Sequence, residues 1–473
     1  MINAYYQHHA RELTRIVKAT PPGAPALLRH FIEAFYAKVH TSDLEQLDAR
    51  HAVSLAASAF RFFESRKKPG PQIRIFTPTV KEHGYESRSV VVELINDDMP
   101  FLVDSLSAEL SRQGFTIRDT LHPVFYVSRD KSGKLAQLSG TCDSKALKAE
   151  SLIHFEISGL PEDISPAQLQ TDLEWVLEYI SCAVNDWQPI EAKALEHVQS
   201  IAEIRHIFDA ESIAEAQDFM RWLISRNFIF LGYAQYDFFD ARGKEKFSAV
   251  QGSKLGILRI GGDATFRGLE SLPPELRHLV LVPTLLEITK TMRRSPVHRP
   301  VPMDCIGIKR FNAKGEVIGE ARFLGLFTSN VYYQSSEHIP VLRHKIARAL
   351  ERADFDPAGH DGKALKAILE FLPRDEVFQM SEDNLLETSL GILALEAKPA
   401  CASSCVPTPS NASYPPWCMS RANASPPTCA TRFRISWKKP STAPPVRFPP
   451  RSPKRRSRAC TSSLKPSRAT FRM

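Results

Sequence analysis

The 473-residue sequence has no apolar run long enough to span a membrane, and it holds only eight cysteines. Its first 30 residues contain charges and prolines where a signal peptide needs an apolar core. Cys142, Cys182 and Cys305 lie far apart and fit no metal-ligand spacing, which favours free thiols in a reducing compartment. These absences predict a cytoplasmic protein with no membrane contact.

The sequence also lacks a nucleotide-binding fingerprint. Its glycine-bearing segments, residues 252–262 and 315–325, have neither the G-x-G-x-x-G spacing nor a strand that runs directly into a helix. No Cys/His group has zinc spacing, and nothing ties Ser, His and Asp residues into a catalytic triad. We therefore expect no catalytic residue, no metal and no cofactor in this chain.

Acidic residues are missing from the end of the chain. Residues 398–473 contain no Asp or Glu, but they hold 15 Lys and Arg, 14 Pro and five of the eight Cys. The residues before them carry 46 basic and 53 acidic side chains, so the net charge of +8 hides a mildly acidic body of −7. Such a tail cannot bury enough surface to offset its ordering entropy, and we predict that it is disordered.

The most informative stretch that is present spans residues 90–114. Its first half is a β-branched apolar run of strand length, and its second half places apolar residues at helical spacing up to Gly114. A strand should therefore turn directly into a helix. Asp97 or Asp98 is the expected N-cap, and Pro100 would lie early in the helix, where its missing N–H is harmless.

The surrounding pattern predicts an α+β fold class. Residues 70–190 read as β-α-β-β-β-α, with a long strand bent near Pro123, which is close to the ferredoxin-like arrangement. Residues 1–68 and 338–397 have helical periodicity, and residues 201–335 read as one helix followed by five antiparallel strands. The basic run at residues 66–71 is interpreted as a solvated linker.

Nine short motifs in this order resemble one family. They are LINDDMPFLVDS (94–105), HPVF (122–125), ESLIH (150–154), NDWQP (185–189), FMRWL (219–223), NFIFLGY (227–233), VHRP (297–300), RFLGLFTS (322–329) and HDGKA (360–364). Together they are similar to the amino-terminal region of the large bacterial NAD-specific glutamate dehydrogenases, over roughly residues 5–397. The resemblance implies an ACT-like domain at 70–190, a PAS-like domain at 201–335, homo-oligomers in the parent family, and NAD bound by a catalytic domain that lies downstream.

The resemblance also implies a ligand site. ACT-like domains commonly bind small amino acids where the first strand enters the first helix, often between paired domains, and here that position is residues 96–100. Backbone N–H groups would receive the carboxylate of an amino-acid effector. Asn96, Asp97 and Asp98 line the turn, and the side chain of Asp97 or Asp98 would pair with the ammonium group of the effector. Two alternatives remain open, since Asp97 and Asp98 could be plain helix caps, or these two could form an acidic metal group with Asp104.

A second candidate is a basic segment punctuated by prolines. It could hold an anion or contact a neighbouring domain, because arginine forms bidentate bonds to carboxylates, or it could be an exposed connection. Its basic residues are Lys290, Arg293, Arg294, His298 and Arg299.

The codons of the tail suggest a shifted reading frame. Trp417-Cys-Met-Ser420, regrouped from the base before TGG, encodes an apolar β-type pattern, and Trp437-Lys-Lys-Pro440 regroups to an acidic helical one. We therefore expect residues 398–473 to be translated out of frame, with the chain truncated and inactive by itself. A basic, Pro-rich arm that binds nucleic acid is the alternative, although it would lack interleaved aromatics and sequence specificity.

Three hypotheses follow. The chain is the regulatory and assembly part of an NAD-dependent glutamate dehydrogenase, whose implied reaction converts L-glutamate to 2-oxoglutarate and ammonium. Alternatively it is a free-standing amino-acid sensor, or a polyanion-binding protein acting through its tail.

Overall fold

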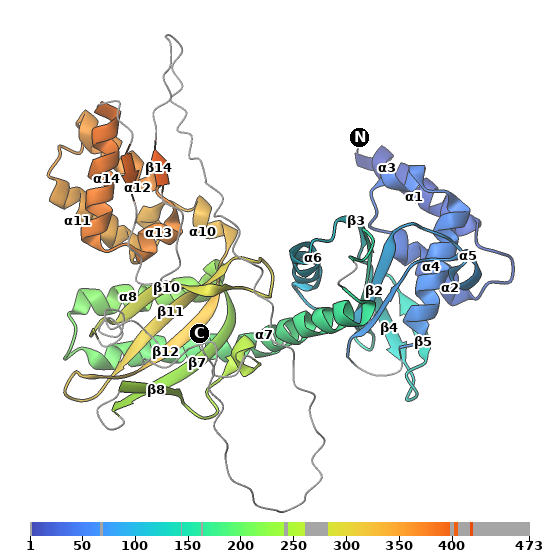
Figure 1. The fold of residues 1–473 in the computed structure, drawn as a ribbon, viewed down its shortest axis with the longest axis horizontal. Helices are drawn as coiled ribbons and strands as arrows, with labels where there is room; N and C mark the ends of the chain where they lie inside the picture. The colour runs from blue at the N-terminus through green and yellow to red at the C-terminus, as the bar shows by residue number, and fades with distance from the viewer. Residues whose placement is uncertain are drawn as a thin grey trace, which may run out of the picture. The chain divides into compact units, whose positions relative to one another are not determined.

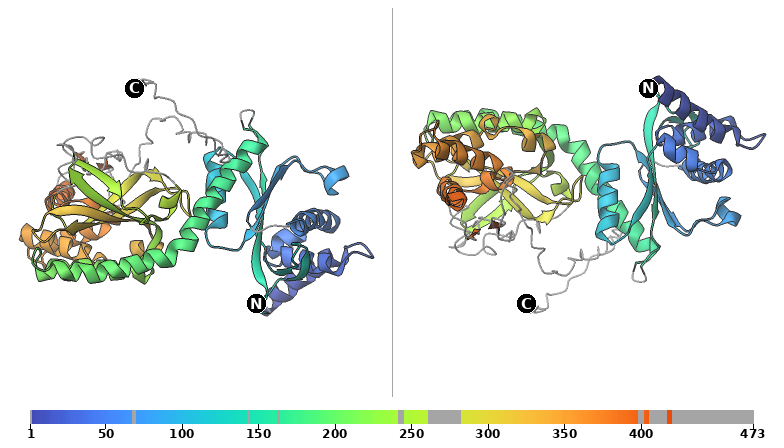
Figure 2. Two further views of the ribbon diagram at one scale, coloured as in Figure 1. Left: turned by 90° about the horizontal axis from the view of Figure 1, so that it is seen from below. Right: turned by 90° about the horizontal axis from the view of Figure 1, so that it is seen from above.

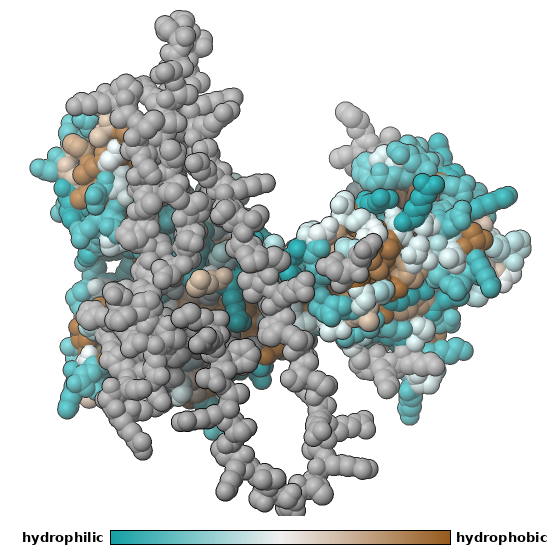
Figure 3. Space-filling view, viewed as in Figure 1, coloured by the Kyte–Doolittle hydropathy of each residue, from teal (hydrophilic) through white to brown (hydrophobic). Residues whose placement is uncertain are grey.

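The computed structural model describes residues 2–66, 70–142, 144–161, 164–240, 245–260, 282–397, 402–404 and 417–419. Over these residues the chain is α+β, with two large antiparallel sheets and the helices labelled in Figure 1. The described surface in Figure 3 is mainly hydrophilic, with hydrophobic residues showing in small groups. Among the described helices, none is long and apolar enough to cross a membrane.

The chain begins with four helices, within the residues whose periodicity is helical. Their core is aromatic: the ring of Phe31 stacks on that of Phe125 at 4.6 Å between centroids, and Phe63 lies 4.9 Å from the same ring. Asp48 caps the fourth helix, because its Oδ1 accepts the N–H of His51 at 2.8 Å. The helices are α1 (Ile2–Lys18), α2 (Ala26–Tyr36), α3 (Thr41–Gln46) and α4 (Ala49–Glu64).

The first sheet has the strand order β1-β2-β6-β4-β5, with β3 also paired to β6. The predicted bend at Pro123 is a break between two strands that pair with successive parts of β6, since proline lacks the N–H that a ladder needs. A short helix, α5 (Val80–His83), precedes β2. The strands are β1 (Gln72–Phe76), β2 (Val90–Asp97), β3 (Ile117–Leu121), β4 (Val124–Arg129), β5 (Leu135–Ser139) and β6 (Lys148–Ile157).

This sheet resembles the ferredoxin-like arrangement with one exchange. Strand β2, helix α6 (Leu102–Arg112), the β3 and β4 pair, β6 and helix α7 (Pro166–Ser200) follow the first five elements of β-α-β-β-α-β. The edge beside β2 is taken by β1, which comes before these elements in the chain and pairs antiparallel to β2. A strand from the amino-terminal side therefore completes the sheet.

Helices cover both faces of this sheet (Figure 2). Alternate residues of β2 point to opposite faces, so Val92 and Leu94 join the cluster that includes Leu106 of α6, while Ile95 joins the cluster that includes Phe31 of α2. Because both faces are covered, β2 is buried from Val90 to Asn96. The result is a three-layer α/β/α unit in which β2, an inner strand, leads into the predicted ligand turn.

Helix α7 is longer than its sequence pattern predicts. Helical periodicity in the sequence predicts a helix over residues 166–184, yet the helix continues through Pro189 to Ser200. Ile190, Ala194 and Val198 beyond the proline are buried in the core of the second sheet, and this packing outweighs the lost backbone hydrogen bond. One helix therefore packs on both sheets.

The second sheet has the strand order β10-β11-β12-β7-β8, with β9 paired to β7. Helix α8 (Ala210–Trp222) packs on it through Phe219 and Met220, and Asp209 caps this helix by accepting the N–H of Ser212 at 2.7 Å. Strands β11 and β12 form a hairpin, with Gly315 at φ +81° where a left-handed turn residue is needed. The strands are β7 (Phe228–Asp240), β8 (Glu245–Ala249), β9 (Leu255–Gly256), β10 (Leu286–Arg294), β11 (Pro302–Phe311) and β12 (Val317–Phe327).

The predicted helical region shares its core with the second sheet, because Leu342, Leu365 and Leu385 belong to the same buried cluster as Phe323. The structure adds one helix that the pattern did not predict, which begins directly after Pro373. The helices are α10 (Ser329–Tyr333), α11 (Leu342–Ala353), α12 (His360–Phe371), α13 (Arg374–Gln379) and α14 (Glu382–Ala397).

A separate unit follows, made of residues 401–405 and 414–473. Within it two short strands pair antiparallel, β13 (Ala402–Ser404) and β14 (Trp417–Met419), where the composition predicted disorder. The rest of the predicted tail lies outside the described residues.

Candidate functional site

The turn between β2 and α6 differs from its prediction. The N–H of Asp98 donates to Ala149 O at 3.0 Å, so pairing with β6 continues past the end of β2. Phe101 occupies the N-cap position with φ +73°, and the helix makes no side-chain cap hydrogen bond. The prediction that Asp97 or Asp98 caps α6, with Pro100 inside the helix, is therefore wrong, because the extended strand and the left-handed residue delay the helix to Leu102.

The three predicted ligand residues lie together in this turn, but their side chains have different partners. Asn96 is buried, and its Nδ2 donates to Asp97 O at 3.1 Å. The side chain of Asp97 is 61% exposed and forms an ion pair with Arg66 at 2.7 Å. Asp98 is exposed and accepts a hydrogen bond of 2.5 Å from Ser151 Oγ. Two carboxylates therefore remain open to solvent on one turn.

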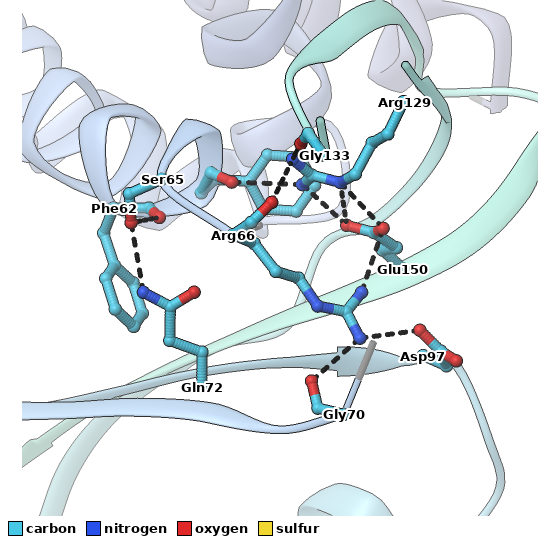
Figure 4. A network of polar contacts seen from close by, with 10 residues as sticks. Phe62, Ser65, Arg66, Gly70, Gln72, Asp97, Arg129, Gly133 and Glu150 are labelled. Atoms are coloured by element: carbon cyan, nitrogen blue, oxygen red, sulfur yellow. Dashed lines mark hydrogen bonds and ion pairs between the residues drawn. The ribbon is translucent and has the colours of Figure 1, made fainter. Parts of the chain in front are cut away.

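Arg66 organises a network of charges behind this turn (Figure 4). Its guanidinium bonds Asp97 on one side and Glu150 Oε1 on the other at 2.9 Å, and Arg129 Nη2 reaches Glu150 Oε2 at 2.8 Å. Arg129 also donates to Phe63 O of α4 at 3.0 Å. The network ties the end of α4, β4 and β6 to the turn, so it fixes the place of Asp97.

The burial of Arg66 contradicts the prediction for this residue. The sequence placed it in a solvated linker, yet its side chain is only 3% exposed. Phe63 lies four residues after Ala59 and Arg66 three residues after Phe63, so Arg66 continues the buried stripe of α4. That periodicity was the available signal, and the neighbouring Lys67 and Lys68 obscured it.

A second polar row runs from Asp98 through Ser151 to His122. Ser151 Oγ lies 3.1 Å from His122 Nε2 and donates its proton to Asp98. Burial lowers the pKa of His122, and the Asp98 carboxylate partly offsets this shift. Because the hydroxyl proton is already directed to a carboxylate, the imidazole does not activate Ser151, and the row orients Asp98 without forming a catalytic triad.

Deeper in the same sheet, Glu93 and His154 form a buried ion pair. Glu93 Oε1 lies 2.9 Å from His154 Nδ1, and Arg74 Nη2 reaches Glu93 Oε2 at 2.6 Å. Burial alone would lower the pKa of His154, but attraction to the carboxylates of Glu156 and Glu93 outweighs it and raises the pKa to about 9. Burial likewise would raise the pKa of Glu93, and His154 and Arg74 lower it below its ordinary value. The pair is therefore charged at neutral pH.

The basic residues of the second candidate do not converge on one point. Lys290 Nζ is buried between Asp304 and Asp375, at 2.6 and 3.2 Å. His298 lies at the tip of the β10–β11 hairpin, against Asp104 of α6 at 3.0 Å.

The arginines of the same segment have other positions. Arg299 Nη2 donates to Phe327 O at 2.5 Å, and Arg294 Nη1 donates to Pro300 O at 2.9 Å. Arg293 is exposed. The set therefore spreads along a hairpin that reaches both neighbouring domains, and it makes no single anion pocket.

The alternative that the three aspartates bind a metal ion finds no support in the described residues. Asp97, Asp98 and Asp104 face Arg66, Ser151 and His298 respectively. Within the described ranges, no group of three His, Cys, Asp or Glu residues is placed to hold a metal ion.

Sequence reasoning missed Arg66, Arg129, Glu150 and Ser151, which position the turn. Glu150 and Ser151 stood within one of the nine family-like motifs, ESLIH, but their spacing from residue 97 in the sequence gives no sign of contact. Only the pairing of β2 with β6, which sets Asn96 opposite Ser151 and Asp97 opposite Glu150, brings them together.

Comparison with known proteins matches two separate regions of the chain. Residues 31–173 match the family described as glutamate dehydrogenase, ACT1 domain, and residues 339–398 match glutamate dehydrogenase, helical motif 1. The first match takes in α2 and α4 as well as the sheet that they cover.

Among similar proteins are three NAD-specific glutamate dehydrogenases. That of Halomonas elongata is 34% identical over 373 residues, which is 78% of this chain and 23% of the relative. That of Pseudomonas aeruginosa is 32% identical over 369 residues, with the same coverage of 78% and 23%. The protein of Mycobacterium tuberculosis is 25% identical over 309 residues, 64% of this chain and 18% of the relative. The chain thus spans less than a quarter of the length of these curated relatives.

Proposed function

The chain belongs to the NAD-specific glutamate dehydrogenase family, as its amino-terminal region, and from this premise we propose that it regulates and assembles a cytoplasmic enzyme that oxidises L-glutamate with NAD. The parent reaction would yield 2-oxoglutarate, ammonium and NADH. A free-standing sensor is not favoured, because a helical motif of the same family follows the ACT1 domain. The observation that carries the proposal is the turn at residues 96–101, where two solvent-exposed carboxylates adjoin the start of a helix.

An amino acid is the effector that suits this turn. Its carboxylate would lie at the N–H groups of the first turn of α6, where the helix dipole favours an anion. Its ammonium group would pair with Asp98, which Ser151 holds in place, and Asp97 adds a second negative charge held by Arg66. The two ends of a zwitterion thus meet groups of opposite sign on one turn.

Two finer assignments belong to the same proposal. The domain of residues 201–335 is PAS-like, which its five main antiparallel strands and the packing of α8 support. The parent enzyme is a homo-oligomer, and pairing of ACT domains would bring two such turns to one interface. Neither assignment requires a metal or nucleic acid.

We also propose that residues 398–473 are read out of frame. Every acidic residue disappears at Lys398, and the match to helical motif 1 extends to that same residue. Resequencing the gene across the codons for residues 397–405 tests this proposal: a single-base insertion or deletion supports it, and an intact frame in independent isolates contradicts it.

The purified chain is expected to form no NADH from glutamate and NAD. Both large sheets are antiparallel, whereas the known dinucleotide fingerprint requires a parallel βαβ unit, and no such unit occurs among the described residues. Absorbance at the NADH band, compared with a host-extract blank, measures the rate. Turnover above that blank would show that the region is catalytic and would overturn its assignment as a regulatory part.

Asp98→Asn is expected to weaken amino-acid binding roughly 10-fold to 150-fold, the range for losing a hydrogen bond to a charged group. Asparagine keeps an acceptor for Ser151 Oγ, so the free energy of unfolding should stay within about 0.5 kcal/mol of wild type. Calorimetric titration of the full chain with L-glutamate, L-aspartate and other amino acids measures the affinity.

Asp119→Asn is the matched control, since it removes an exposed carboxylate from β3 of the same domain. It should bind like wild type. Equal affinities of Asp98→Asn and wild type would remove Asp98 from the site, and no heat from any amino acid with wild type would leave the turn without a ligand.

A further inference from the structure

The tip of the β10–β11 hairpin inserts into the ACT1 domain. Residues 295–301 form this tip, and Val297 at its centre is fully buried in the same apolar cluster as Leu102 and Leu106 of α6. The tip is closed internally, because the N–H of Ser295 donates to Val301 O and the hydroxyl of Ser295 donates to Val297 O. A compact loop of the second domain therefore packs on the helix that begins at the proposed effector turn.

Polar contacts lock this packing at the first turn of α6. The N–H of His298 donates to Ser105 Oγ at 2.9 Å, and His298 Nδ1 lies 3.0 Å from Asp104 Oδ2. The imidazole also lies 5.2 Å from the ring of Phe101, measured between centroids. The start of the helix, which lacks a cap from its own turn, is thus held by a residue almost two hundred positions away.

Both residues at this contact have unusual backbones. Phe101 has φ +73° and His298 has φ +67°, in the left-handed region that is unfavourable for a residue with a bulky side chain. Such conformations persist only where neighbouring contacts hold them, and they occur often in switch regions. Undocking of the tip would remove contacts that hold both residues in this conformation.

A series of hydrogen bonds and ion pairs connects Arg299 in the tip with Asp375 in the helical motif. Arg299, next to His298, donates to Phe327 O, and the N–H of Phe327 donates to Asp304 Oδ2 at 3.1 Å. Asp304 Oδ1 pairs with Lys290 Nζ at 2.6 Å, and Lys290 reaches Asp375 Oδ2 at 3.2 Å.

The far end of this chain of contacts lies on α13. Asp375 belongs to the first turn of that helix and also accepts a hydrogen bond from Tyr332 of α10. Lys290 and Asp304 are buried, so their interactions are weakly screened by solvent. The hairpin therefore contacts α6 at its tip and α13 at its base.

We propose that the β10–β11 hairpin couples the first turn of α6 to helix α13, so that docking of its tip and the stability of the helical motif depend on each other. The regulatory meaning of this coupling rests on the proposed effector turn, which adjoins Phe101. The coupling itself requires no effector. It gives the ACT1 domain a physical connection to the helical motif that follows it in the chain.

Hydrogen exchange of the full chain, without any amino acid added, tests the coupling. His298→Ala should speed exchange at residues 102–106 and also at residues 374–379, by a factor of roughly 2 to 30 in each, the range that mutations along coupled networks produce. Coupling is reciprocal, so Asp375→Asn at the other end should speed exchange at residues 102–106. Arg293→Ala, which removes an exposed charge from the same hairpin, should change neither region.

Faster exchange confined to residues 295–301 in His298→Ala, or an unchanged α6 in Asp375→Asn, would overturn the proposal. Asp104→Asn provides a second approach if His298→Ala fails to fold, because the Asp104 side chain is 58% exposed and its loss leaves the core intact. Failure of the effector proposal would be seen separately, as an absence of binding heat, and would leave these exchange rates unaffected.

Discussion

Replacing His154 by alanine is expected to lower the free energy of unfolding by about 3–5 kcal/mol, the usual effect of breaking a buried ion pair. The change would leave Glu93 buried in the centre of the sheet with Arg74 as its remaining cation. It would also open a cavity beside β2, which adds to the loss. Denaturant unfolding of wild type and variant at pH 7 measures the difference.

The effect of His154 should depend on pH in a defined direction. The pKa of His154 is raised from 6.5 to about 9 in the folded chain, so its contribution is complete below pH 6.5 and is lost as pH rises through about 9. The pKa of Glu93 is lowered in the folded chain, so its contribution is present above the ordinary value of 4.5 and is lost as pH falls.

His154→Gln is the matched control for charge, because it keeps a hydrogen-bond donor and removes the titration. The stability difference between wild type and His154→Gln should therefore shrink between pH 7 and pH 10. A difference that stays constant over this range would show that His154 is neutral when folded, which contradicts a charged pair.

Replacing Glu150 by alanine is expected to lower the free energy of unfolding by a similar amount, about 3–5 kcal/mol. Arg66 and Arg129 share this carboxylate, and its removal would leave one buried and one half-buried guanidinium group beside each other, with Asp97 still paired to Arg66 (Figure 4). Chemical denaturation again measures the effect. The turn should also lose affinity for an amino acid, since Asp97 is held by Arg66.

An exposed ion pair provides the comparison. Glu196 pairs with Lys193 on the surface of α7, with 60% and 39% of their side chains exposed, and Glu196→Ala should change stability by less than about 1 kcal/mol. If Glu150→Ala costs no more than Glu196→Ala, the network around Arg66 does not hold α4 and the turn together.

Local pattern predicted the elements near the turn well, and contacts distant in sequence decided the rest. The apolar run of β2 and the helical spacing of α6 are set by residues close in sequence, and the structure confirms both, while the strand predicted to bend at Pro123 is broken there into β3 and β4. The start of α6 was misplaced because the extra strand bond of Asp98 depends on β6, about fifty residues away. Helix α7 was predicted too short because only the second sheet shows why residues beyond Pro189 stay helical.

The candidate sites show the same division. The sequence placed Asn96, Asp97 and Asp98 in one turn, which is where they lie, because three consecutive residues cannot separate. It could not show that Arg66 pairs with Asp97 or that His298 contacts Asp104, since each depends on an approach between distant segments. A partner far along the chain cannot be identified from local pattern, even where periodicity places a charged residue on a buried stripe.

Hydrogen exchange at the β2–α6 turn, with and without saturating amino acids, tests the central claim that this turn senses an amino acid. The account predicts slower exchange at residues 96–105 with at least one of them, because the ligand carboxylate would bond the free N–H groups at the start of α6. The protection should fall in Asp98→Asn at the same concentration. Protection that appears only elsewhere in the chain, or none with any amino acid, would contradict the assignment of this region as an amino-acid sensor.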